Sequence, residues 1–151
     1  KDKSDLIYFV EDDYLHYENS LVNMLNTYVR VSSQHKDEII VCPSDYPFNY
    51  MNNEKTNILI GSQQHWRTIT KMLCTFMISK KMFQKHIDNF EKTCEKRHEP
   101  FEKYLNKILE SEIGISPIKS LAIHMTNVNS SYGLSPFMDI KKLWEENKID
   151  Q

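Results

Sequence analysis

Short apolar runs alternate along the chain with segments of helical periodicity. Runs that are rich in β-branched residues predict strands covered on both faces, and they occupy residues 5–10, 38–42 and 57–60. A run at residues 72–78 is compatible with either a strand or a helix, and residues 119–124 form a fifth candidate strand. The pattern therefore predicts a sheet of several short strands.

Apolar residues spaced three or four apart predict amphipathic helices between and after these strands. The helices are expected over residues 19–31, 80–92 and 101–109, and around residues 140–144. The third fits the template best, with Pro100 at a permitted first helical position. Strands that alternate with helices predict an α/β fold, a mixed sheet with flanking helices. We interpret residues 1–151 as a single domain.

Composition and charge narrow the function classes. A chain of 151 residues can bury a core of its own. Its net charge of −2 offers no basic surface, so nucleic acid is not expected as a partner. No apolar run reaches the ~20 residues of a membrane span. The 3 cysteines lack CxxC spacing, which argues against a disulfide framework or a cysteine zinc site and suits a cytoplasmic location.

An acidic turn follows the first predicted strand. Glu11, Asp12 and Asp13 come directly after the apolar run, and ligands of open α/β sheets bind beyond the carboxyl ends of strands. Carboxylates suit Mg²⁺ or Mn²⁺, whose remaining ligands are commonly substrate phosphates and water. The alternative is a solvated turn before a helix, whose dipole also favours carboxylates. The residues alone leave both interpretations open.

Several segments resemble glycosyltransferases of the GT-A fold. YFVEDDYLH (8–16) resembles their acidic, DxD-type strand end. Four later segments resemble, in the same order, parts of one subgroup of these enzymes: VCPSDYPFNY (41–50), HWRTITKMLCTFMIS (65–79), IKSLAIHM (118–125) and LSPFMDIKKLW (134–144). The resemblance implies metal-dependent transfer of a sugar from a nucleotide-diphosphate-sugar donor to an acceptor hydroxyl.

The same resemblance implies a nucleotide-binding half before the acidic strand. The chain opens at Lys1, only a few residues before its first predicted strand. We therefore expect it to be the C-terminal, acceptor-side half of a longer glycosyltransferase, or a truncated relative without activity of its own. The second case would make it a non-catalytic module that binds a carbohydrate or a protein. A metal-dependent phosphohydrolase is a third hypothesis.

The resemblance also assigns roles at the metal site. It implies that Asp13 is the first metal ligand and Asp12 the second candidate, with Glu11 near the ribose or base of the nucleotide. It implies that His124 completes a site for Mn²⁺ or Mg²⁺. The alternative for His124 is a hydrogen-bonded residue at a strand edge. His16 has no matching metal role and is expected in a loop or at a helix start.

The sequence also offers candidates for binding the sugar donor and for activating the acceptor hydroxyl. The Trp66 face suits stacking on a sugar and the Arg67 guanidinium suits a pyrophosphate, although a core tryptophan and a partner arginine are equally consistent with the sequence. An inverting transfer needs a general base. Glu99, just before Pro100, and Asp45 are the candidates. The alternatives are a helix-capping role for Glu99 and an Asx turn for Asp45.

Overall fold

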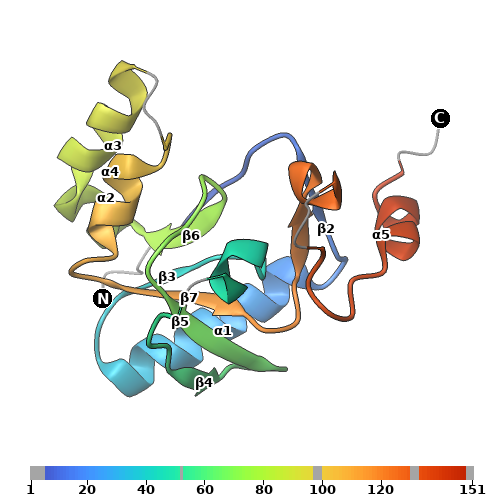
Figure 1. The fold of residues 1–151 in the computed structure, drawn as a ribbon. Helices are drawn as coiled ribbons and strands as arrows, with labels where there is room; N and C mark the ends of the chain where they lie inside the picture. The colour runs from blue at the N-terminus through green and yellow to red at the C-terminus, as the bar shows by residue number, and fades with distance from the viewer. Residues whose placement is uncertain (1–5, 52, 97–99, 130–132, 149–151) are drawn as a thin grey trace.

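A computed structural model describes residues 6–51, 53–96, 100–129 and 133–148. Figure 1 shows the strands and helices, whose bounds follow. The strands are β1 (Leu6–Phe9), β2 (Tyr14–His16), β3 (Ile39–Val41), β4 (Ile58–Ile60), β5 (His65–Ile69), β6 (Phe76–Ser79), β7 (Ile113–Pro117) and β8 (Ala122–His124). The helices are α1 (Ser20–His35), α2 (Lys80–Lys85), α3 (Ile87–Glu95), α4 (Lys103–Ile108) and α5 (Ile140–Glu146), with 3₁₀ helices η1 (Pro47–Tyr50) and η2 (Met125–Asn129).

Two sheets are present in the described part of the chain. The larger has 6 strands in the order β1-β6-β3-β7-β5-β4, and the smaller pairs β2 with β8. Only β3 and β7 run parallel among the paired neighbours described, so the large sheet is mixed. The predicted mixed α/β sheet with flanking helices is confirmed.

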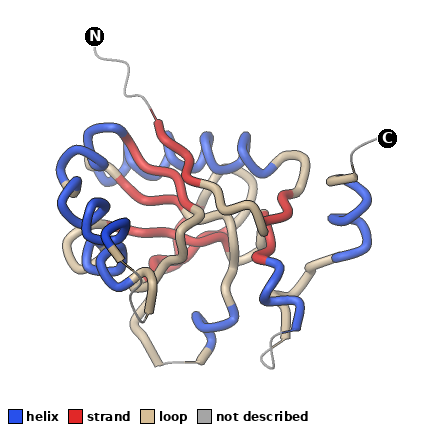
Figure 2. The backbone as a smooth tube through the Cα atoms, turned by 90° about the horizontal axis from the view of Figure 1, so that it is seen from above, coloured by secondary structure: helices blue, strands red, loops and turns tan. Residues whose placement is uncertain are grey.

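The large sheet separates two hydrophobic clusters. Alternate residues of a strand point to opposite faces. Ile39 and Val41 of β3 accordingly pack with Met24 and Tyr28 of α1. Ile40, between them, packs on the other face in the cluster that includes residues of α2 and α4. Figures 1 and 2 show α1 and the α2–α4 group on different sides of the sheet, and the β2–β8 pair and α5 away from the α2–α4 group.

Most predicted strands are found, although several are shorter than expected. The segment at 72–78 contributes a strand, β6, and only the end of 119–124 does so, as β8. The pattern missed β2, β5 and β7. Because β2 has 3 residues and carries a histidine, it has no apolar run to reveal it. His16 therefore lies in a strand, not in a loop or at a helix start. The expectation that β4 is covered on both faces is wrong, since Ile58 and Ile60 are 57% and 62% exposed.

Helix boundaries differ from the predictions in two places. The helix expected over 80–92 divides at His86 into α2 and α3. The helix expected over 101–109 begins only at Lys103, so Pro100 is not its first residue. No helix in the described ranges is both long and apolar enough to cross a membrane.

Gly61 starts the turn that joins β4 to β5, and its lack of a side chain accommodates Trp66. The Gly61 N–H donates to the Gln64 carbonyl at 2.9 Å. A Cβ at this position would lie 2.3 Å from both Cδ1 and Nε1 of Trp66. The fully buried indole has no room to yield, because it packs between the sheet and α1.

We expect Gly61→Ala to lower the free energy of unfolding by about 1–3 kcal/mol through overpacking. Urea unfolding followed by tryptophan fluorescence measures the change. Ser62→Ala, in the same turn, is the control and should shift stability by less than about 0.5 kcal/mol. Equal effects of the two substitutions would contradict the steric explanation.

Candidate metal centre

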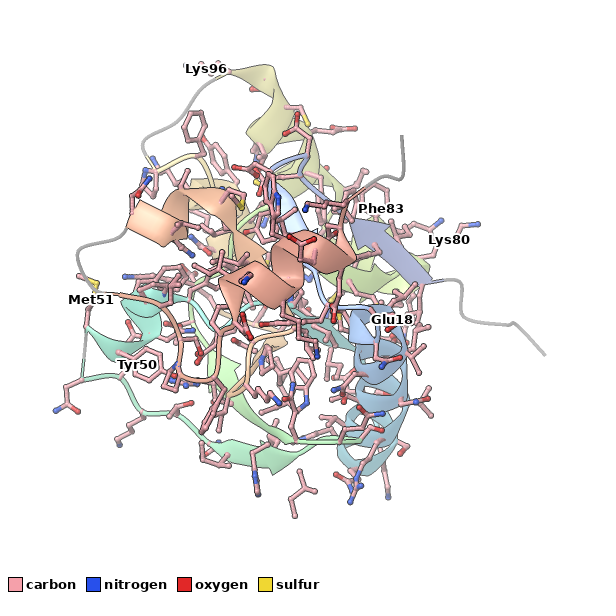
Figure 3. All side chains as sticks on the ribbon, turned by 90° about the vertical axis from the view of Figure 1, so that its right-hand side faces the viewer. Glu18, Tyr50, Met51, Lys80, Phe83 and Lys96 are labelled. Atoms are coloured by element: carbon pink, nitrogen blue, oxygen red, sulfur yellow. The ribbon has the colours of Figure 1, made fainter. Side chains whose placement is uncertain are left out.

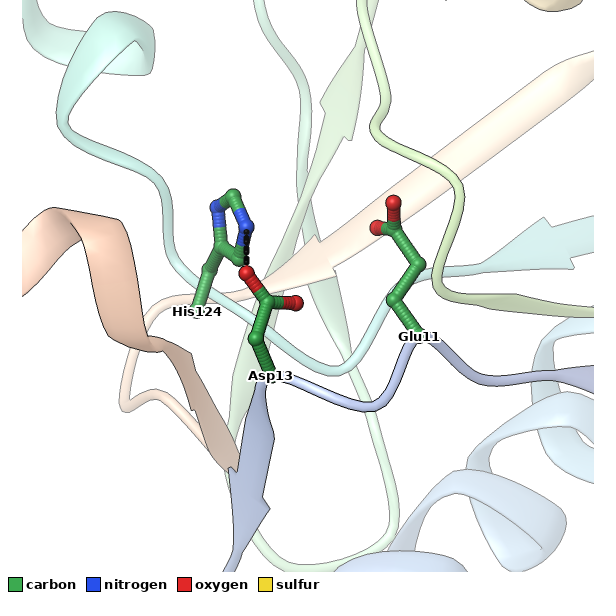
Figure 4. Close-up of side chains that lie close together, drawn as sticks. All are labelled: Glu11, Asp13 and His124. Carbon is green, nitrogen blue, oxygen red and sulfur yellow. Dashed lines mark ion pairs between the residues drawn. The ribbon is translucent and has the colours of Figure 1, made fainter.

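The small sheet brings Asp13 next to His124. Tyr14 of β2 is paired with His124 of β8, and the Met125 N–H donates to the Asp13 carbonyl at 2.9 Å. This register places Asp13 Oδ2 2.7 Å from His124 Nε2 (Figure 4). Two of the residues that the sequence suggested as metal ligands are therefore in contact across the sheet.

Glu11 is the third member of this cluster. One ligand atom from each of Glu11, Asp13 and His124 lies within 4.8 Å of the others, and all three residues are half-buried. The turn is held by the Glu11 N–H, which donates to the hydroxyl of buried Thr75 at 3.0 Å. Burial raises the pKa of the Glu11 carboxyl; His124 opposes this shift, and the charges of Asp13 and Glu102 add to it. Negative charge gathered here favours a cation.

The imidazole of His124 is fixed on two sides. Its ring stacks on Tyr14 with centroids 4.9 Å apart, and the Tyr14 hydroxyl lies 2.9 Å from that of Tyr46. Thr126 Oγ1 lies 2.9 Å from Nδ1. When Nε2 binds a metal, the ring proton must be on Nδ1. The Nδ1–H group can then donate a hydrogen bond to the Thr126 hydroxyl. The ring thus turns Nε2 toward the carboxylates and has a partner for its other nitrogen.

This donor set fits some ions better than others. Calcium prefers six to eight oxygen ligands, whereas Mn²⁺ accepts carboxylate oxygen together with imidazole nitrogen. Glu11, Asp13 and His124 supply such a mixture and leave coordination positions for other groups. The residues present therefore fit Mn²⁺ better than Ca²⁺, and they fit Mg²⁺ through the two carboxylates. In this structure Asp13 and His124 bind each other in an ion pair.

Asp12, the second candidate ligand, does not join the cluster. Its side chain is exposed and contributes no ligand atom. Glu99 lies outside the described residues. The carboxylate found at the start of α4 is Glu102, the residue before its first turn, and its charge acts on Glu11.

Trp66 lies in the core. Its indole is 0% exposed and belongs to the cluster that packs α1 on the sheet. Its face is therefore not available to a sugar, which corrects the expected stacking role in favour of the alternative, a core residue. Buried Nε1 has no hydrogen-bond partner within the described ranges.

Asp45 and Arg67 form a buried ion pair. Arg67 Nη2 lies 3.1 Å from Asp45 Oδ1, and the Asp45 side chain is 0% exposed. The hydroxyls of Ser135, at 2.6 Å, and of Tyr50 donate to the other oxygen. The guanidinium carbon lies 4.4 Å from the centre of the Tyr50 ring. Arg67 is thus engaged by its own chain, and the phosphate role expected for it has no support here.

The surroundings of Asp45 bear on its role as a base. Burial raises the pKa of this carboxyl, while Ser135, Tyr50 and Arg67 lower it. A raised pKa suits a general base, but both oxygens are enclosed by these groups and cannot reach an acceptor hydroxyl in this arrangement. The geometry favours a structural role that ties η1, β5 and the segment at Ser135 together.

Sequence reasoning missed the groups that hold the cluster. Thr126 and Tyr14 fix the imidazole, and Thr75 holds the acidic turn. Thr126 could have been found from its position two residues after a candidate histidine ligand. Tyr14 could not, because its stacking follows from a strand pairing that the pattern does not reveal.

The chain was compared with known proteins at three levels. No family model, no curated protein and no solved structure matches it. The arguments for its function therefore depend on its own sequence and on the geometry of its residues.

We expect Asp13→Asn to weaken Mn²⁺ binding by at least tenfold, because it removes one charged ligand while preserving side-chain size. Thr126→Val should weaken it by about tenfold, the loss typical of a partner that orients a ligand. Calorimetric titration with Mn²⁺ measures both. Asp12→Asn is the matched control from the same turn and should bind as the unaltered protein does. If Asp12→Asn weakened Mn²⁺ binding as much, the overall negative charge of the turn, and not the cluster, would hold the ion.

We expect Arg67→Met to lower the free energy of unfolding by about 3 kcal/mol near neutral pH, because it leaves a buried carboxylate unpaired. The pKa of Asp45 in the folded state is already above its unfolded value, so ionisation of this group costs stability as the pH rises through the folded pKa. Loss of Arg67 raises that pKa further. The deficit should therefore shrink on acidification, as Asp45 becomes protonated in both proteins.

Chemical denaturation across a pH series measures this dependence. Asp45→Asn combined with Arg67→Met should recover stability near neutral pH and flatten the pH dependence. If Arg67→Met showed the same deficit at every pH, the ion pair would not be its cause.

Proposed function

We propose that this chain is the acceptor-side half of a GT-A-like glycosyltransferase that uses a nucleotide-diphosphate-sugar and a divalent cation. The observation that carries the proposal is the convergence of Glu11, Asp13 and His124 beyond the carboxyl end of β1. This is where ligands of α/β sheets bind. The order of the resembling segments along the chain supports the same family.

Each residue of the cluster would have a role of its own. Asp13 and His124 would hold Mn²⁺ or Mg²⁺ in place of their mutual ion pair. Glu11, raised in pKa by burial, would add a ligand once ionised or would meet the ribose of the donor. A bound ion would neutralise the diphosphate leaving group as the glycosidic bond breaks.

Glu102 joins Glu99 as a candidate for the base of an inverting transfer. It is a half-buried carboxylate at the start of α4, and its charge acts on Glu11. A general base must lie within hydrogen-bond reach of the acceptor hydroxyl, so proximity to the cluster favours Glu102 over the enclosed Asp45. The acceptor would be a carbohydrate or another hydroxyl compound.

A non-catalytic binding module is the second candidate function. The observation in its favour is that Asp13 with His124, and Asp45 with Arg67, form ion pairs within the chain, so that their charges have partners without a ligand. The phosphohydrolase hypothesis has less support, because the described residues form one cluster of this kind and a two-metal site needs more carboxylates.

Transfer and donor hydrolysis by the full-length protein test the proposal. A panel of UDP- and GDP-sugars with Mn²⁺ should give turnover that Asp13→Ala abolishes and Asp12→Ala preserves. Glu102→Gln should lower kcat by about 100-fold or more if this residue is the base, with the donor affinity unchanged. Calorimetry with UDP or GDP should show binding only with Mn²⁺.

Two results would contradict the proposal. Turnover that survives Asp13→Ala would remove the metal assignment. Absence of metal-dependent nucleotide binding by the full-length protein would favour the binding module instead.

A further inference from the structure

A polar pocket of about 460 Å³ lies away from the metal cluster. It is bounded by the start of α1, the turn between β4 and β5, the approach to β8, and α5. Figure 3 shows Glu18, one of its residues, at the start of α1, with α5 toward the viewer. β2 leads from the cluster to this pocket, and the four residue steps from Asp13 to Tyr17 span about 13 Å of extended chain. The pocket is therefore a separate site.

The charges around the pocket do not suit an anion. Glu18, Asp139 and Glu146 oppose Lys119 and Lys142. Lys142 also lies 3.5 Å from a Glu146 oxygen, which leaves less positive charge for a ligand. A phosphate or nucleotide site needs a surplus of positive charge or clustered backbone N–H groups. With three acidic and two basic residues, the pocket has no such surplus, and its mixed charges favour a neutral ligand over an anion.

Side-chain amides supply hydrogen-bonding groups for such a ligand. Asn23, Gln63 and Gln64 line the pocket. The Nε2 of Gln64 is buried and has no hydrogen-bond partner in the part of the chain that the structure describes. A buried donor without a partner is unusual in a folded protein. A turn of the Gln64 side chain toward the pocket would bring this donor to an acceptor oxygen on a ligand.

Phe137 borders the same pocket and has an unfavourable backbone conformation. Its φ of 67° lies in the left-handed region, which bulky residues avoid. The ring is also 82% exposed, so little burial compensates for the strain. Backbone strain of this kind clusters at ligand sites. The conformation presents an aromatic side chain at the edge of a pocket lined by amides.

We propose that this pocket binds a neutral saccharide. The apolar face of a sugar ring packs on Phe137, and its hydroxyls bond to the amides of Asn23, Gln63 and Gln64. The volume suits a small ligand, and the uncharged, many-hydroxyl chemistry of sugars matches the mixed charges and the amides. The inference rests on this pocket alone and does not require the metal cluster to function.

NMR titration of the ¹⁵N-labelled chain, without metal, tests the inference. The probes are neutral mono- to trisaccharides of glucose, galactose, mannose and N-acetylglucosamine. At least one should shift the side-chain amide signals of Gln63 and Gln64 in a saturable manner. Asp13→Ala should leave this binding unchanged, which separates it from the proposed transferase site.

Phe137→Gly gives the sharpest variant. Glycine adopts a φ of 67° without strain, so the melting temperature should stay the same or rise. Saccharide binding should nevertheless weaken by about tenfold through loss of the aromatic face. Gln63→Ala is a second variant and should also weaken binding. Phe101→Ala, an exposed phenylalanine outside the pocket, is the matched control and should bind normally.

Three outcomes would overturn the proposal. The first is that no saccharide of the panel shifts the pocket amides. The second is that Phe137→Gly binds as tightly as the unaltered chain. The third is that UDP without metal, and not a saccharide, produces the shifts.

Discussion

The burial of β3 on both faces is the constraint on which the rest of the structure depends. The four residues from Ile39 to Cys42 are 0% exposed, so both sides of this strand must be covered by other elements. α1 covers one face, and the cluster that includes residues of α2 and α4 covers the other. The strand also pairs with β6 on one edge and β7 on the other. Both faces and both edges of β3 are therefore occupied, which fixes the position of the strand in the fold.

The chain that leaves β3 carries this constraint to the metal cluster. The Pro43 carbonyl accepts from the Leu121 N–H at 2.9 Å, and the Ser44 hydroxyl donates to the Ala122 carbonyl at 2.8 Å. The Asp45 N–H donates to the Ser120 hydroxyl at 3.0 Å. These bonds fix β8 beside the exit of β3. Because β8 carries His124 and pairs with β2, they also fix the distance between His124 and Asp13.

The sequence predicted those parts of the fold that depend on local pattern. Continuous apolar runs revealed β1 and β3, and the run at residues 72–78 left β6 open between a strand and a helix. The run is clearest at β3, because a strand buried on both faces needs apolar residues throughout. The acidic turn and His124 were also visible as residue types. The pattern missed β2, and it could not show that β2 pairs with β8, because pairing between distant segments leaves no periodic signal. The sequence could not show, for the same reason, that Trp66 is buried or that other side chains enclose Asp45.

The two ends of the small sheet now have different chemistry. At one end, Asp13 and His124 offer ligands to a cation. At the other, Tyr17 and Leu121 border a pocket lined by both acidic and basic residues. The same pair of strands connects them, and β3 anchors that pair. A movement of β8 would therefore displace His124 and the pocket together. Bonds from the exit of β3 oppose such a movement, so the separation between cluster and pocket is set by the rigid part of the fold and not by a loop.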